Sequence, residues 1–259
     1  MPEGPEVKTF TDSLQFIVNH QLQDIIVTGG RFSSHQFDHV NLPLIVQEVN
    51  CKGKLIYWKF SNDLFMLNSL GMTGSWSLSP NNYTHVIFQF NDDIKLYFND
   101  IRHFGIIKFV SNKDFIKKMK SLGPDMLSSP PNNVEFALFF NKDINITKFL
   151  MDQKYPSGVG NYIKSEALYR SKISPHRKAN SLSELELSNL RQEIISVMQQ
   201  SYSLQGATLS NYYTLNKEEG KFSEFLQVYG KQKDPLGNSI TKETTLDGRS
   251  TWWVKNIQR

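Results

Sequence analysis

The spacing of hydrophobic positions changes twice along this chain. Val7, Phe10, Leu14 and Ile17 recur at helical spacing near the start, and this pattern predicts an amphipathic helix of about three turns. From residue 24 to residue 110, short β-branched and aromatic runs alternate with turn residues, which predicts strands. Several short strands in succession are typical of a β-sandwich or a barrel.

Helical spacing returns after residues 121–133, where Gly and Pro interrupt the strands and indicate an interdomain linker. Ser183-Glu184-Leu185-Glu186 has the sequence of a capping box. Near the end, Asp247-Gly248 signals a two-residue hairpin turn between strands at 241–246 and 249–255. We therefore predict an α+β protein with an N-terminal β-sandwich and flanking helices at 1–125, a linker at 126–133, a helical domain at 134–228 and a hairpin at 229–259.

Composition limits the setting and the partner. Of 259 residues 39% are hydrophobic, and no apolar run approaches the roughly 20 residues that cross a bilayer. The net charge of +4 is compatible with a polyanionic partner but does not require one. Cys51 is the only cysteine, which excludes an intramolecular disulfide and a cysteine-cluster zinc site. We expect no signal peptide and a reducing intracellular compartment, the nucleus or the cytoplasm.

The first six residues, MPEGPE, are a candidate for chemistry. We expect removal of Met1, which leaves Pro2 with a free secondary amine. An α-amino group has a pKa of about 7.7–8.0, so much of it is unprotonated at neutral pH and can form a Schiff base with a sugar aldehyde carbon. Glu3 is placed to act as a general acid or base. The alternative, which these residues alone favour, is a plain helix entry with Pro5 in the first turn.

A second candidate is Gly158-Val159-Gly160-Asn161, where two glycines permit a tight turn before a helix. Backbone N–H groups at such a helix start can hold a phosphate. In isolation, an ordinary helix-to-helix turn is the better explanation of a lone G-x-G.

Together these segments resemble the Fpg/Nei family of DNA glycosylases. The hexapeptide is similar to the family's N-terminus, and the G-V-G-N run followed by Glu166 resembles its helix-two-turns-helix motif. The resemblance implies that Asn161 contacts a DNA phosphate. Gly53-Lys54 resembles a glycine–lysine pair of the family, in which the lysine contacts phosphate and assists elimination. We also place Glu6 in the DNA-binding set.

The stretch 100–105, D-I-R-H-F-G, resembles the D-x-R-x-F-G loop of the same family. The resemblance implies that Met72, Arg102 and Phe104 form a wedge that fills the hole left by a flipped-out base. Without it, Met72 and Phe104 could belong to the core and Arg102 could be a surface charge. His85 matches a phosphate-contacting histidine of the family.

The C-terminal hairpin resembles the family's zinc finger without its ligands. Residues 234–238, D-P-L-G-N, stand where the first cysteine pair is expected. Gly248-Arg249-Ser250-Thr251-Trp252 matches the strand that carries an arginine, so the resemblance implies that Arg249 holds a phosphate. From the residues alone Arg249 would be a solvated hairpin residue. The hairpin thus looks like the zincless finger of a eukaryotic endonuclease VIII-like enzyme. We expect no metal and no other cofactor.

The resemblance implies a bifunctional DNA glycosylase and AP lyase. Pro2 attacks C1′ of a damaged nucleotide, Glu3 supplies the proton that helps open the sugar, and β- and δ-elimination cut the strand. The implied partner is DNA with oxidised bases or abasic sites, and we expect a monomer. The rival hypotheses are a non-catalytic damage-binding protein of the same fold and a helix-turn-helix regulator, which would need no N-terminal amine.

Substrate preference is a separate expectation. Gly4, Tyr162 directly after Asn161, and the missing zinc ligands favour the endonuclease VIII branch, which prefers oxidised pyrimidines. The connection at 206–229 favours the opposite, because its length and flanks are similar to the Fpg segment that closes over 8-oxoguanine. We predict oxidised pyrimidines, with Fpg-type specificity for 8-oxoguanine and formamidopyrimidines as the alternative.

Overall fold

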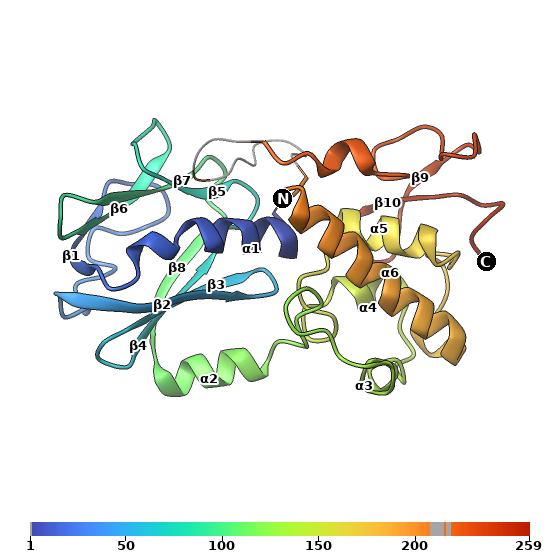
Figure 1. The fold of residues 1–259 in the computed structure, drawn as a ribbon, viewed down its shortest axis with the longest axis horizontal. Coiled ribbons are helices and arrows are strands. Elements are labelled where there is room, and N and C mark those ends of the chain that lie inside the picture. Colours follow the sequence, from blue (N-terminus) through green and yellow to red (C-terminus); the bar gives the residue numbers. More distant parts are fainter. Residues whose placement is uncertain (1, 208–214, 216–218) are drawn as a thin grey trace.

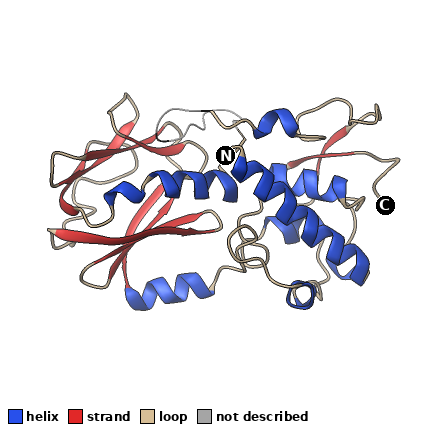
Figure 2. Cartoon of the chain, in the orientation of Figure 1, coloured by secondary structure: helices blue, strands red, loops and turns tan. Residues whose placement is uncertain are grey.

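The computed structural model describes residues 2–207, 215 and 219–259. Figure 1 shows a strand-rich N-terminal half beside a helical C-terminal half, with the N-terminus between them. Figure 2 shows the same division by element type, with one small hairpin at the far end of the helical half. In the described part of the chain, no helix is long and apolar enough to cross a membrane.

The N-terminal half is one open antiparallel sheet that folds into two layers (Figure 1). Its strand order is β5-β7-β6-β1-β2-β3-β4-β8, and the two layers meet where β1 and β2 pair over only two residues each. The sheet is therefore a sandwich and not a closed barrel. The strands are β1 (Gln21–Val27), β2 (Leu44–Lys52), β3 (Leu55–Phe60), β4 (Leu64–Ser69), β5 (Gly74–Ser77), β6 (Thr84–Phe90), β7 (Lys95–Asp100) and β8 (Ile106–Ser111).

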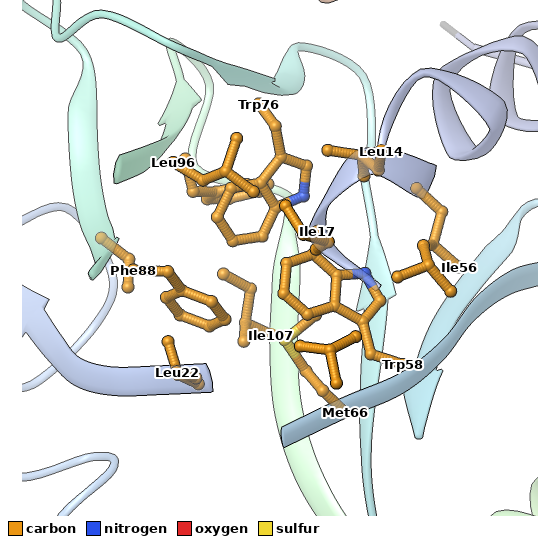
Figure 3. Packing of buried hydrophobic residues seen from close by; sticks show 14 of the residues in the cluster. Leu14, Ile17, Leu22, Ile56, Trp58, Met66, Trp76, Phe88, Leu96 and Ile107 are labelled. Atoms are coloured by element: carbon orange, nitrogen blue, oxygen red, sulfur yellow. The ribbon is translucent and has the colours of Figure 1, made fainter. Parts of the chain in front are cut away.

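The sandwich core lies around Trp58, which points inward from β3 because side chains alternate between the two faces of a strand. Its ring lies 5.5 Å, centroid to centroid, from those of Trp76 and Phe88 (Figure 3). Burying each such side chain stabilises the fold by about 1.5–3 kcal/mol.

The first predicted helix is confirmed at its predicted length of about three turns, but it ends before Leu14 and Ile17. Helix α1 (Gly4–Ser13) buries Val7 and Phe10, and the apolar face continues through the 3₁₀ turn η1 (Gln15–Ile17). Pro5 lies in the first turn of α1, where its missing N–H costs no helical hydrogen bond.

The helical half is built around α6, which begins at the predicted capping box. The Ser183 backbone N–H donates to Glu186 Oε2 over 2.7 Å, and the Glu186 N–H donates to Ser183 Oγ over 3.3 Å. Helix α5 packs against α6 and against the hairpin. The other elements are α2 (Asn112–Lys120), α3 (Asn133–Leu138), α4 (Ile146–Met151), α5 (Asn161–Arg170), η2 (Ala179–Ser181), α6 (Glu184–Ser203) and η3 (Phe222–Phe225).

The hairpin has a longer turn than the sequence predicted. Strands β9 (Thr241–Thr244) and β10 (Ser250–Trp253) leave five residues between them, not the two of Asp247-Gly248. The Thr245 N–H donates to the Arg249 carbonyl over 3.0 Å and closes this wider turn. Arg249 therefore lies in the turn itself. The α+β architecture is otherwise the one predicted.

Candidate active site

The N-terminal segment docks on the start of α5 through glycine contacts. The Gly4 N–H donates to the Gly158 carbonyl over 2.9 Å, and a Cβ at Gly4 would lie 3.0 Å from Gly158 Cα. A Cβ at Gly160 would overlap the Glu3 carboxylate. Gly160 is thus required for this close approach, because any side chain there would push Glu3 away, and Gly158 has a positive φ of 93°, which favours glycine.

Glu3 is 2% exposed, and its carboxylate caps the N-terminal end of α5. Its Oε1 accepts from the Tyr162 N–H over 3.0 Å, and its Oε2 accepts from the Ile163 N–H over 3.3 Å. Burial raises the pKa of Glu3 to about 7, and the positive charge of Lys54 partly opposes that rise. A carboxyl with this pKa can give or take a proton at neutral pH, as a general acid or base must.

Lys54 reaches the same place from the turn between β2 and β3. Gly53 has a positive φ of 58°, and a Cβ there would lie 2.7 Å from the Gly158 nitrogen. Burial lowers the pKa of Lys54, while Glu3 raises it and Arg249 lowers it further. Lys54 is therefore close enough to both charges to respond to them.

Sequence reasoning missed Asp125, which holds this turn in place. Its Oδ2 accepts from the Gly53 N–H over 2.7 Å, and its Oδ1 accepts from the N–H groups of Leu127 and Ser128. Asp125 follows Gly-Pro in a stretch interpreted as a linker. An Asp in a turn commonly accepts a hydrogen bond from the backbone N–H two residues further on. That preference was the feature of the sequence that could have pointed to Asp125.

Glu6 is buried, and its carboxylate faces protein groups. Its Oε2 accepts from the Glu3 N–H over 2.8 Å; its Oε1 accepts from Tyr162 Oη over 2.9 Å and from the Ala207 N–H over 2.7 Å. The predicted DNA contact of Glu6 does not match this placement, because no face of the carboxylate is open to solvent. Glu6 instead orients the N-terminal segment and the residue that precedes the undescribed stretch 208–214.

Asn161 and Arg249 lie together where α5 meets the hairpin. Asn161 Nδ2 donates to the Ser250 carbonyl over 2.9 Å, so the amide already holds the backbone next to Arg249. The Arg249 side chain is exposed, and its charge lowers the pKa of Lys54. Three of the predicted phosphate ligands, Lys54, Asn161 and Arg249, thus lie near one another and near Glu3.

The predicted wedge residues come from two loops that touch. A Cβ at Gly71, which has a positive φ of 60°, would lie 2.8 Å from the Phe104 carbonyl carbon. The Arg102 guanidinium carbon lies 5.1 Å from the centre of the Phe104 ring, a cation–π distance. Met72 is 38% exposed and Phe104 is 49% exposed. The alternative that these two belong to the core is therefore wrong.

Asp100 organises the loop that carries Arg102 and Phe104. Its Oδ1 accepts from Thr73 Oγ1 over 2.5 Å and its Oδ2 accepts from the Gly105 N–H over 2.6 Å. His85 supports the same loop, since its Nε2 lies 2.9 Å from the Asp100 carbonyl. His85 is buried in this position and acts on the loop, which does not match the predicted phosphate contact.

The residues of the hairpin do not fit a zinc ion. Cys51 lies buried in the sandwich, and the described residues include no group of three or more His, Cys, Asp or Glu side chains that could hold a metal. At 234–238, Asp234 Oδ1 accepts from the N–H groups of Leu236 and Asn238, and its Oδ2 accepts from Tyr169 Oη. Hydrogen bonds to one carboxylate fold this turn.

A β-sandwich whose N-terminal segment docks on a helical domain with a basic hairpin is the architecture of a DNA glycosylase with lyase activity. The sequence matches the model of the formamidopyrimidine-DNA glycosylase N-terminal domain at residues 1–107 and that of its H2TH domain at 122–212. The chain therefore belongs to the formamidopyrimidine-DNA glycosylase family.

The relatives that match over the full length include bacterial proteins. The formamidopyrimidine-DNA glycosylase of Lactiplantibacillus plantarum is 32% identical over 273 residues, and that of Listeria monocytogenes is 31% identical over 276; the match covers all of both chains in each case. These matches do not support the narrower expectation of a zincless eukaryotic endonuclease VIII-like type.

Solved structures of the same family superpose on the whole chain. A Lactococcus lactis FPG mutant in complex with Fapy-dG containing DNA has a TM-score of 0.89, with 26% identity over 100% of both chains. The MutM (FPG) protein of Thermus thermophilus has a TM-score of 0.89, with 27% identity over 99% of this chain and 98% of that one.

Proposed function

We propose that this protein removes damaged bases from DNA and cuts the strand, with Pro2 as the nucleophile. The observation that carries the proposal is the placement of Glu3. Its carboxylate lies next to Pro2 in sequence, at the N-terminal end of α5, with a pKa of about 7 and Lys54 close by. Such a group can donate a proton at the site where an adjacent amine attacks.

In the proposed mechanism the unprotonated Pro2 nitrogen forms a bond to C1′. The bond from C1′ to the base breaks, the base leaves with the electron pair, and it takes up the proton that the Pro2 nitrogen loses. Glu3 donates a proton to the sugar ring oxygen as the ring opens, which leaves a cationic iminium at C1′. The iminium acidifies the neighbouring C2′–H, so loss of that proton expels the 3′ phosphate, and a second elimination expels the 5′ phosphate.

Three residues grip the DNA backbone in this proposal. Lys54 and Arg249 supply positive charge, and Asn161, whose amide also donates to the Ser250 carbonyl beside Arg249, supplies the third phosphate contact. Phosphate contacts of this kind fix the position of the duplex without reading its sequence. Met72, Arg102 and Phe104 enter the stack from the other side, and their exposed apolar and planar surfaces suit that role.

For the substrate we infer formamidopyrimidine and 8-oxoguanine lesions, in place of the oxidised pyrimidines predicted from sequence. The full-length relatives are named formamidopyrimidine-DNA glycosylases. Related solved complexes include FPG with Fapy-dG containing DNA and MutM with carbocyclic 8-oxo-G containing DNA. An oxidised pyrimidine complex of Lactococcus lactis FPG shows that the second lesion class can also be bound in this family.

Two of the three features that favoured pyrimidines, Gly4 and Tyr162, have other physical explanations. Gly4 is needed for the approach to Gly158. The Tyr162 hydroxyl donates to Glu6 and lies 2.9 Å from Ser201 Oγ, so Tyr162 serves the interior. The 206–229 connection was the one feature that favoured Fpg-type specificity, and most of its central part lies outside the described residues.

Single-turnover cleavage of matched duplexes tests both the proposed activity and the proposed substrate preference. We expect formamidopyrimidine and 8-oxoguanine opposite cytosine to be excised faster than thymine glycol or dihydrouracil. Faster excision of the pyrimidines would contradict the substrate inference alone. Tight binding without any nicking, even of a preformed abasic site, would point to a non-catalytic damage-binding protein and contradict the function.

A further inference from the structure

A buried ion pair joins α5 to the turn of the hairpin. Lys164 Nζ lies 2.6 Å from Asp247 Oδ2, and the two side chains are 0% and 3% exposed. Lys164 lies in the first turn of the helix that begins at Asn161, and Asp247 lies two residues before Arg249. Sequence reasoning assigned no role to either residue beyond the turn.

The second oxygen of Asp247 shapes the turn that carries Arg249. Asp247 Oδ1 accepts from Thr245 Oγ1 over 2.6 Å and from the Arg249 N–H over 3.4 Å. Thr245 Oγ1 also lies 2.6 Å from Thr251 Oγ1. One carboxylate therefore links the helix to both ends of the turn.

Charge gives the pair a second consequence. A carboxylate left unpaired at Asp247 would attract the Arg249 guanidinium and repel a DNA phosphate. Lys164 neutralises that carboxylate, and the Arg249 side chain forms no hydrogen bond or ion pair with any residue in the described ranges. A buried pair of this kind adds little net stability, because desolvation offsets the attraction, so its value is in fixing geometry.

We propose that Lys164 and Asp247 are positioning residues for Arg249, holding its guanidinium free and aimed at the DNA backbone. The inference rests on the proposed function, in which Arg249 grips phosphate. Backbone N–H groups of α5 hold Glu3, and the Lys164 side chain on the same helix anchors Asp247. Helix α5 thus sets the distance between Glu3, the proton donor, and Arg249, which grips phosphate. It also anchors the hairpin, whose described residues include no set of metal ligands.

The test is a double-mutant cycle on DNA affinity, with a duplex that contains a tetrahydrofuran abasic analogue. A hydrogen bond to a charged group contributes about 1.5–3 kcal/mol, so Arg249→Ala should weaken binding by about 10- to 100-fold. Lys164→Met should weaken it by about tenfold, because the bare carboxylate engages Arg249. Lys164→Met with Asp247→Asn should recover most of that loss.

In the Arg249→Ala background, Lys164→Met should change affinity by less than about twofold, because coupled residues are non-additive. The slope of log Kd against log salt should fall by about one in Arg249→Ala and also in Lys164→Met. In Lys164→Met the loss should appear in the KM of abasic-site cleavage more than in its kcat, because Lys164 acts only through Arg249.

The matched control is Glu243→Gln, which breaks the exposed ion pair of His176 with Glu243 on the same hairpin. Its affinity should equal that of the wild type. If Lys164→Met does not fold, the double variant Lys164→Met with Asp247→Ala replaces it, because it removes both charges and the acceptor of the turn. The double variant should bind DNA more weakly than the wild type, and it should cause no further loss when Arg249→Ala is already present.

Equal losses from Lys164→Met with and without Arg249 would overturn the positioning role. Failure of the wild type to nick abasic DNA would instead remove the proposed function, and the two failures are therefore distinguishable.

Discussion

At the scale of single residues, the chemistry depends on the environment of one carboxyl group. Glu3 is buried, accepts two backbone N–H groups at the start of α5, and has a pKa of about 7 because burial disfavours its charged form. Its role as a proton donor can be separated from that of the Pro2 amine, because a preformed abasic site no longer needs help with base departure.

Glu3→Gln should therefore lower base excision by about 10²- to 10⁴-fold, the usual contribution of a general acid. Cleavage of a preformed abasic site should fall by less than about tenfold, the change expected when that step needs no general acid. Single-turnover rates on the two substrates measure this difference. Equal losses on both, together with loss of covalent trapping, would mean that Glu3 acts through folding or orientation.

The same pKa predicts how stability depends on pH. Between the ordinary value of 4.5 and about 7, the folded protein holds a proton on Glu3 that the unfolded chain has lost. The free energy of unfolding of the wild type should therefore fall as pH rises through this window. Glu3→Gln lacks this dependence. As pH rises through the window, the free energy of unfolding of Glu3→Gln should therefore increase relative to that of the wild type by up to about 3 kcal/mol. Urea unfolding at pH 5 and pH 8 measures it, and an unchanged difference would contradict burial as the origin of the raised pKa.

At the scale of elements, the G-V-G-N run and the hairpin turn position the reacting groups. The backbone of Gly160 has a φ of −130°, which any residue adopts, so only the Glu3 carboxylate stands where a Cβ would be. The hairpin is folded by carboxylates at Asp234 and Asp247.

Gly160→Ala should displace Glu3 and lower base excision at least about 100-fold, since small displacements of catalytic groups have effects of this size. Gly237→Ala is the control, because it has a positive φ of 86° and open space around it. The control should lose about 1 kcal/mol of stability and keep its excision rate. Excision by Gly160→Ala at the wild-type rate would mean that the contact does not position Glu3.

Removal of metal should leave the hairpin and its activity intact. Elemental analysis of the purified protein should find no stoichiometric zinc, and a chelator should not change the rate of abasic-site cleavage. A chelator-sensitive rate that zinc restores would contradict a hairpin folded by carboxylates.

At the scale of the whole molecule, local signals predicted elements and long-range contacts decided the site. The capping box at Ser183 and the stripe of Val7 and Phe10 were readable because each lies within one helix. The contact of Asp125 with Gly53 and the ion pair of Lys164 with Asp247 join segments 72 and 83 residues apart. No periodicity encodes such pairs, so only the folded chain shows them.

The turn length of the hairpin was mispredicted for the same reason. Asp-Gly favours a two-residue turn locally. In the folded chain the Asp247 side chain instead pairs with Lys164, and the hydrogen bond from the Thr245 N–H to the Arg249 carbonyl closes a wider turn. Family resemblance supplied the roles of Pro2, Lys54 and Arg249, which remain proposals. It placed Glu6 and His85 at the site, although both are buried supports.

Covalent trapping is the most direct test of Pro2 as the nucleophile. Borohydride reduction during reaction with abasic DNA should yield a stable protein–DNA adduct, and peptide mapping should place the DNA on Pro2. Retention of Met1 or an N-terminal tag should abolish the adduct, because the secondary amine is then blocked. An equally strong adduct from blocked protein, or one mapped to a lysine, would show that Pro2 is not the nucleophile.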